Sequence, residues 1–127
     1  MAVVDDVMSE PWVWGATDCC ASACDVFARL HGIDPMQAVR GSYNTAMGAV
    51  RLIQSWGGMV AMAEGLAAAS DLSASDGATG DIGLSAPGFA EGPEGRALLI
   101  CIQPGAWAGK AVDGFVILPN AERCWRV

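Results

Sequence analysis

The sequence predicts a single α+β domain over residues 1–127, with helices in its first part and an antiparallel sheet in its last part. Apolar residues recur at helical spacing up to about residue 69, and short apolar runs separated by Gly and Pro follow at hairpin spacing. Helices first and strands second are typical of α+β proteins, whose helices pack on one face of the sheet. A chain of 127 residues that is 53% hydrophobic can bury one such core.

Two helices are expected before residue 32. Residues 2–8 predict a short helix. The second helix is expected from about Asp18 to Leu30, because its apolar residues recur at helical spacing. Thr17 or Asp18 is its expected N-cap, and Gly32 is its expected end.

Two more helices are expected between residues 44 and 69. Asn44 or Thr45 is the expected cap of the first, and Gly57 is its expected end. Its bulky apolar side chains are expected to face inward, namely Met47, Val50, Leu52 or Ile53, and Trp56. Residues 59–69 predict a weaker helix, and the Ser-, Asp- and Gly-rich residues 70–80 predict a loop.

The last third of the chain predicts the sheet. Five short apolar runs are expected to form its strands: residues 81–86, 96–103, 107–111, 114–118 and 123–127. The run ALLICI within the second of them is apolar throughout, which indicates a central strand buried on both faces. The segment GFAEGPEG before it predicts a hairpin tip, in which the two glutamates are exposed to solvent.

Charge and composition disfavour several classes of partner. The net charge is −7, from 14 acidic and 7 basic residues, and no basic cluster is present that could replace the counterions of a nucleic acid. A basic face for binding a membrane surface is also missing, and every long apolar stretch is interrupted by a charged residue or Gly. The first ten residues carry two aspartates where a secretory signal carries Lys or Arg, so no signal peptide is expected.

The five cysteines are expected to be free thiols, because nothing in the sequence indicates secretion. Cys20 and Cys24 are spaced i,i+4 and could place two metal ligands on one helix face, with His31, Cys101 or Cys124 as further ligands. The paired C-x2-C spacing of zinc sites is absent, so no metal and no cofactor is expected. A metal-binding module is kept as a third functional alternative.

Four segments together carry a resemblance to a known family. WVWGATDC at residues 12–19, DPMQAVRGSYNTAMGAVRL at 34–52, GDIG at 80–83 and CWRV at 124–127 occur in this order. With them the chain resembles the NlpC-type, papain-like superfamily of cell-wall peptidases and amidases. Within it, the chain is most similar to a small group encoded by tailed phages and prophages of proteobacteria. The resemblance implies a minimal NlpC-type papain-like fold.

The resemblance also implies a nucleophile at Cys19, with Asp18 before it as in the family's DC motif. A thiolate at the N-terminus of a helix is stabilised by the helix dipole, and a neighbouring histidine takes its proton. In the active enzymes that histidine opens the strand after the GD motif. Here Arg96 and Ala97 occupy the position, and Gln103 falls near the third position of the triad.

His31 is the only histidine, and it lies on the same predicted helix as Cys19. Twelve residues of helix separate the two by about 18 Å, whereas a nucleophile and its base must come within roughly 3 Å. The sequence therefore predicts that Cys19 and His31 do not form a catalytic dyad.

These observations favour a catalytically degenerate scaffold. By resemblance its partners are tail or virion proteins, and its location is the virion or the host cytoplasm during assembly. The alternative is an active cysteine peptidase or amidase that cleaves peptidoglycan peptides, with Cys19 as the nucleophile and a carboxylate such as Asp81 as the base. Trp12 and Trp14 are expected to wall the cleft beside Cys19, and Gln103 is a further candidate for binding.

Overall fold

The structure, a computed structural model, describes residues 1–89 and 91–127 and confirms the α+β prediction. Its helices are α1 (Ala2–Met8), α2 (Cys19–His31), α3 (Ala46–Ser55) and α4 (Met59–Ala69), with a short 3-10 turn, η1, at Pro93–Gly95. Its strands are β1 (Ser73–Ala74), β2 (Ile82–Leu84), β3 (Leu98–Gln103), β4 (Ala106–Ala111), β5 (Gly114–Leu118) and β6 (Arg123–Arg126). Within the described residues, no helix combines the length and the apolar character needed to cross a bilayer.

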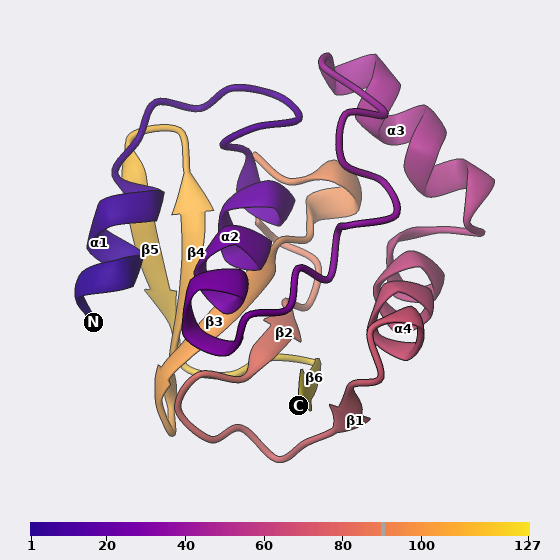
Figure 1. Ribbon diagram of the computed structural model, residues 1–127. Coiled ribbons are helices and arrows are strands. Elements are labelled where there is room, and N and C mark those ends of the chain that lie inside the picture. The colour runs from indigo at the N-terminus through magenta and orange to yellow at the C-terminus, as the bar shows by residue number, and fades with distance from the viewer. Residues whose placement is uncertain (90) are drawn as a thin grey trace.

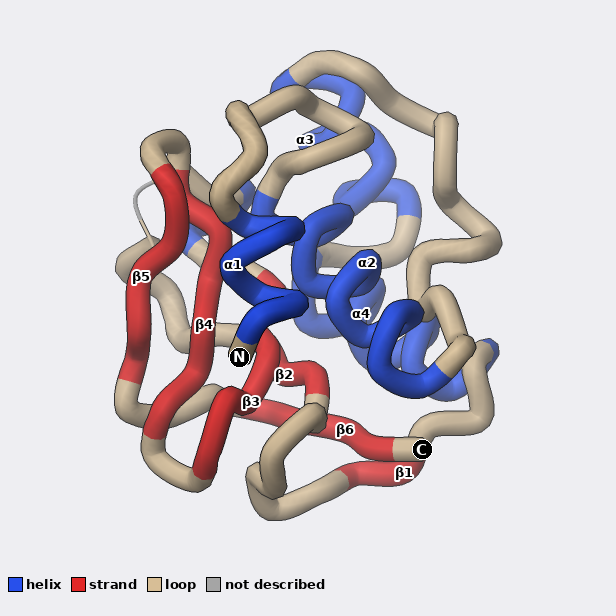
Figure 2. The backbone as a smooth tube through the Cα atoms, turned by 60° about the vertical axis from the view of Figure 1, so that its left-hand side comes forward, coloured by secondary structure: helices blue, strands red, loops and turns tan. Residues whose placement is uncertain are grey.

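The six strands form one antiparallel sheet in the order β1-β6-β2-β3-β4-β5 (Figures 1 and 2). β3 lies inside this sheet between β2 and β4, and Leu99, Ile100 and Cys101 on it are fully buried. The prediction that ALLICI forms a central buried strand is therefore confirmed. The other four predicted runs also form strands; residues 114–118 have the predicted ends, and the ends of the others differ by at most two residues.

β1 is the strand that the sequence did not predict, because it lies in the expected loop of residues 70–80. Ser73 and Ala74 pair with Arg126 and Trp125 of β6. Two exposed small residues show no apolar alternation, so their extended form depends on pairing with the far end of the chain.

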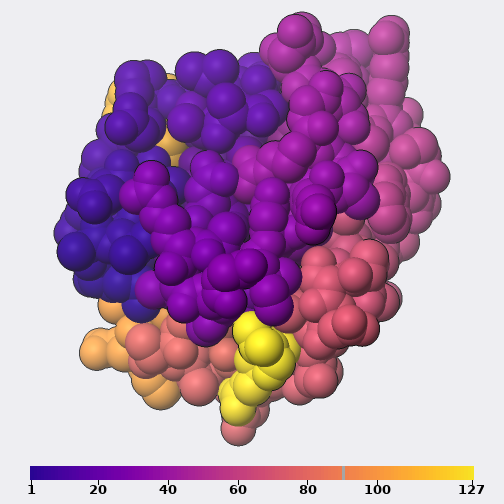
Figure 3. Space-filling model, viewed as in Figure 1, coloured from indigo at the N-terminus to yellow at the C-terminus, as the bar shows by residue number. Residues whose placement is uncertain are grey.

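α2 is the helix that packs most extensively on the sheet. It packs on β3 and β4, and α1 packs on α2 and β4. Because most of its residues are small, α2 can approach its neighbours closely, and eight of its thirteen residues are buried. Figure 3 shows the molecule from the same side as Figure 1. On this side the chain from the N-terminus to α3 covers much of the surface, and the strands are largely hidden.

The inward face of α3 differs from the prediction. Met47 and Val50 are 60% and 38% exposed, whereas Ala49 and Ile53 are buried and Leu52 and Trp56 are partly buried. Helical residues advance by about 100°, so 49, 52, 53 and 56 share one face, while 47 and 50 lie on the opposite side. The expectation that Met47 and Val50 face inward was wrong, because apolar character alone does not choose between two overlapping stripes.

Glu94 is exposed, as expected, and its carboxylate also caps α4 from a distant part of the chain, whereas Glu91 is partly buried. Its Oε2 accepts a hydrogen bond from the backbone N–H of Met59, at 2.9 Å. Met59 is the first residue of α4, and the N-cap residue Gly58 has no side chain that could do this. The backbone of Glu94 has φ = 56°, in the left-handed region, which aims the side chain at α4 at some cost in strain.

Replacing Glu94 by alanine should therefore lower the free energy of unfolding by about 1 kcal/mol, the usual effect of losing an N-cap. Urea denaturation measures the change, and Glu91→Ala in the same turn is the matched control with an expected effect below about 0.5 kcal/mol. Equal effects of the two substitutions would contradict the capping role.

Candidate functional site

The candidate site is built around the first turn of α2. Asp18 is the N-cap, as predicted, and its Oδ1 accepts hydrogen bonds from the N–H groups of Cys20 (3.0 Å) and Ala21 (2.8 Å). Its Oδ2 accepts from the N–H of Gly15 (2.8 Å) and from the hydroxyl of Tyr43 (2.6 Å). Asp18 is only 1% exposed, so this buried carboxylate is surrounded by four donors.

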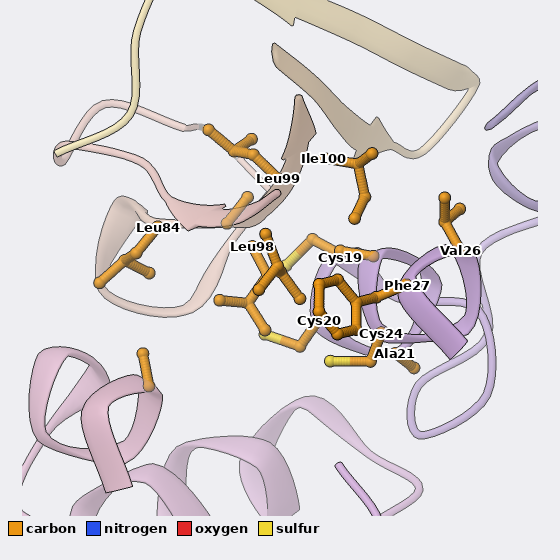
Figure 4. Packing of buried hydrophobic residues seen from close by; sticks show 14 of the residues in the cluster. Cys19, Cys20, Ala21, Cys24, Val26, Phe27, Leu84, Leu98, Leu99 and Ile100 are labelled. Carbon is orange, nitrogen blue, oxygen red and sulfur yellow. The ribbon is translucent and has the colours of Figure 1, made fainter. Parts of the chain in front are cut away.

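Cys19 is the first residue of α2, where the helix dipole is strongest, and it is fully buried. Its Sγ lies 3.9 Å from the backbone carbonyl oxygen of Arg96. Figure 4 shows Cys19 and Cys20 among the apolar side chains of the core. Cys19 thus faces the backbone at the start of β3, the place where the resemblance expects the catalytic histidine.

Neither Arg96 nor Ala97 supplies a base for Cys19. The Arg96 guanidinium donates to the carbonyl oxygen of Ser85, at 3.0 Å, and forms an ion pair with Glu122. Ala97 is fully buried, and its N–H donates to the Ser85 hydroxyl, at 2.9 Å. The side chain of Arg96 is therefore bound to other groups, and it is the backbone carbonyl oxygen of Arg96 that faces the Cys19 thiol.

His31 lies at the opposite end of α2. The helix runs unbroken over thirteen residues, which places about 18 Å between Cys19 and His31. The ring of His31 packs against Phe27, with centroids 4.4 Å apart, and its Nε2 lies 2.8 Å from the carbonyl oxygen of Gly80. The prediction that the two residues do not form a dyad is confirmed.

Asp81, the alternative base, also lies far from Cys19. Its Oδ2 bonds to the N–H of Ala78 and to the guanidinium of Arg126, and its carbonyl oxygen accepts from the N–H of Cys101. Cys101 is five residues beyond Arg96, whose carbonyl oxygen faces Cys19. About 17 Å of extended chain therefore separates the contact of Asp81 from the contact of Cys19. Asp81 belongs to the His31 end of α2.

The carboxylate of Asp18 changes what the start of α2 can do chemically. In a cysteine hydrolase the free N–H groups at this position can bind the oxyanion of the tetrahedral intermediate. Here the N–H groups of Cys20 and Ala21 already donate to Asp18.

Neighbouring ionisable groups are held in their neutral forms. The pKa of Cys20 is raised well above its usual value, first by a hydrogen bond with the Cys19 side chain and then by burial. Burial is also the main cause that raises the pKa of Cys24 and of Tyr43. Cys20, Cys24 and Tyr43 are therefore kept in their protonated, neutral forms.

There is little room for a substrate beside Cys19. The cavity there has a volume of about 10 Å3, which is enough for about one water molecule. Trp14, Tyr43, Ile53 of α3 and Pro93 of η1 are among the residues that line it. α3 and η1 thus close over the thiol.

The structure places the other sequence-predicted residues as follows. Trp14 lines the cavity beside Cys19, as expected, whereas Trp12 packs edge-on against Trp14 with ring centroids 5.2 Å apart. Gln103 is exposed at the far end of β3, beside the turn to β4, so it is not brought to Cys19. All five cysteines are free thiols, and among the described residues no three His, Cys, Asp or Glu side chains lie together in a way that could hold a metal.

Sequence analysis missed Tyr43, which donates to Asp18 across 25 residues of chain. It also missed Pro93 and α3 as the cover of the thiol. No local pattern marks these residues, because each acts only through a contact made by the fold.

The family described as a domain of unknown function (DUF6950) matches residues 1–127. No curated protein and no solved structure gives a significant match to the chain. The match to the family extends over the whole sequence, including the buried Asp18–Cys19 pair at the start of α2. The chain therefore belongs to the DUF6950 family.

Proposed function

We propose that this chain is an NlpC-like protein with a papain-like fold that has lost catalysis and acts as a binding scaffold in the assembly of a phage tail or virion. The observation that carries the loss of catalysis is the surroundings of Cys19. Its thiol is fully buried at the start of α2, where it faces the backbone carbonyl oxygen of Arg96 at 3.9 Å. The NlpC-type arrangement is supported by the same contact, because the cysteine lies opposite the start of the strand that follows the GD motif.

Three physical features support inactivity. The only histidine lies about 18 Å away along α2, so no imidazole can take the thiol proton. Asp18 occupies two N–H groups that could otherwise bind an oxyanion. The cavity beside the sulfur cannot hold a peptide.

The role in tail or virion assembly rests on the resemblance to the phage and prophage group. We expect the genes next to the coding sequence to encode tail or other virion proteins. A locus without phage genes would contradict this part of the proposal while leaving the loss of catalysis unaffected.

Alkylation of the native protein by iodoacetamide at pH 7.5 tests the state of Cys19. A fully buried thiol reacts only when the structure opens, so with a stability of about 5 kcal/mol we expect labelling at least about a thousandfold slower than in the unfolded chain. Cys124, which is only partly buried, is an internal reference and should react faster. Peptide mapping by mass spectrometry assigns each rate to its cysteine.

Hydrolysis of muropeptides is the matching functional measurement. We expect no turnover by the unmodified chain and no difference for Cys19→Ser. Rapid labelling of Cys19 together with turnover that Cys19→Ser abolishes would overturn the proposal and establish a cysteine peptidase or amidase.

A further inference from the structure

The two edges of the sheet differ in a way that points to a second functional surface. β1 forms one edge and has only two residues, whereas β5 forms the other and has five. In the described part of the chain, β4 is the one strand that pairs with β5, so alternate backbone N–H and C=O groups of β5 face outward. An exposed edge of this kind is a template for another strand.

β5 lacks the features that usually protect an edge strand. Soluble proteins place charged residues, Pro or bulges on such edges, but Gly114–Leu118 contains neither a charge nor a proline. Val116 and Ile117 are 40% and 50% exposed, and as neighbours in a strand they point to opposite faces of the sheet. An incoming strand would therefore find an apolar side chain on each face.

A hollow beside the end of β5 adds room for a side chain of the partner. Phe89, Leu118 and Pro119 are among its lining residues, and its volume is about 230 Å3. This is far more space than the cavity beside Cys19 offers.

The rim of this edge is acidic. Asp113 lies in the turn before β5, and both Asp113 and Glu10 lie close enough to Lys110 to influence its amine electrostatically. Lys110 is fully buried, and its Nζ donates to the carbonyl oxygens of Ala111 (2.8 Å) and Gly114 (3.3 Å) rather than to either carboxylate. Neither carboxylate forms an ion pair with a basic side chain of the described residues.

α1 adds further negative charge beside the β5 edge. It packs on β4, next to β5, and exposes the carboxylates of Asp5 and Asp6. These two residues likewise have no ion-pair partner within the described chain.

From these observations we infer that the β5 edge docks an extended segment of a partner protein, with apolar residues at neighbouring positions, so that one lies on each face, and Lys or Arg at its ends. Main-chain hydrogen bonds to β5 provide the pairing, Val116 and Ile117 contact the apolar residues, and the carboxylates attract the basic ends. A second copy fits this edge less well, because each copy carries a net charge of −7 and would bring the same acidic rim against itself. Docking at β5 does not depend on whether Cys19 is active, so the two proposals can fail separately.

A synthetic ten-residue peptide with neighbouring Val residues and Thr between paired lysines is a suitable probe, because it presents Val on both faces of the strand. Titration followed by amide NMR of the full chain should give saturable shifts centred on β5, with a Kd below about 1 mM that weakens as salt is raised. Val116→Lys should weaken binding at least tenfold, because it adds a positive charge at the docking edge. Val13→Lys is the matched control, since Val13 is a similarly exposed apolar residue (54%) outside the sheet, and should leave the Kd unchanged.

Several results would overturn docking of a basic strand at β5. They are the absence of saturable binding, equally tight binding of a peptide with glutamates in place of the lysines, and an equal effect of Val13→Lys and Val116→Lys. Self-association in sedimentation that Val116→Lys abolishes would also overturn it and would assign the edge to a second copy of the chain.

Discussion

Replacing Asp18 by alanine should lower the free energy of unfolding by about 3 kcal/mol, the largest effect that we expect from a single polar substitution. The variant removes the N-cap of α2, which is usually worth about 1 kcal/mol and up to about 2 kcal/mol. It also leaves the N–H of Gly15 and the hydroxyl of Tyr43 without the acceptor that they share. A buried donor without a partner costs about 1–3 kcal/mol.

Chemical denaturation of Asp18→Ala, Tyr43→Phe and the double variant measures this network. Because the two side chains share a hydrogen bond of 2.6 Å, their effects should be non-additive by about 1 kcal/mol or more. Asp18→Asn, which keeps one carbonyl acceptor, should cost less than Asp18→Ala. A loss below about 1 kcal/mol for Asp18→Ala would show that the cap and its buried partners contribute little.

Raising the pH from 8 to 10 should destabilise the fold by about 3 kcal/mol through Cys20 and Cys24. Both thiols are buried and have pKa values raised above the ordinary value of 9.0, so the folded state keeps them protonated. The unfolded chain releases these protons above pH 9. The stabilisation is therefore complete below pH 9 and is lost as the pH rises, by more than about 1 kcal/mol per thiol at pH 10.

Tyr43 adds to this loss only above its ordinary pKa of 10.0, since burial raises its pKa in the folded state as well. Burial lowers the pKa of Lys110, which acts in the opposite direction. Both residues are also present in a Cys20→Ala/Cys24→Ala variant, which makes that variant the appropriate control.

Urea denaturation at pH 8 and pH 10 with a non-thiol reductant measures the difference for both proteins. The double variant is expected to be less stable than the parent at pH 8, but its loss between the two pH values should be about 3 kcal/mol smaller. Equal losses in the two proteins would mean that these thiols ionise as readily in the folded state as in the unfolded chain.

Local sequence signals were sufficient for much of the fold. Asp18 and Gly32 mark the ends of α2 because a cap acts on the backbone groups next to it. The uninterrupted apolar run over residues 97–102 identified the central strand, since only a strand covered on both faces needs such a run. α3 was placed correctly, but its inward face was not, because Met47 is as apolar as the residues that are buried.

For the candidate site, the sequence predicted only that Cys19 has no histidine partner. A single histidine on the same helix as Cys19 excluded a dyad, because the rise of a helix fixes their separation. The closure of the site was not predictable, since Tyr43, Ile53 and Pro93 reach Cys19 from three separate segments. The same holds for Glu94, whose contact with the start of α4 spans 35 residues.

The sequence by itself determined the α+β class, the caps and length of α2, the central strand and the absence of an imidazole near Cys19, because each depends on neighbouring residues and on fixed helix and strand geometry. Only the tertiary structure decided that Asp18 is enclosed by four donors, that α3 and η1 seal the thiol, and that β5 is left as an open edge with an acidic rim. These features depend on contacts between residues far apart in the chain, and such contacts exist only once the helices and the sheet have packed together.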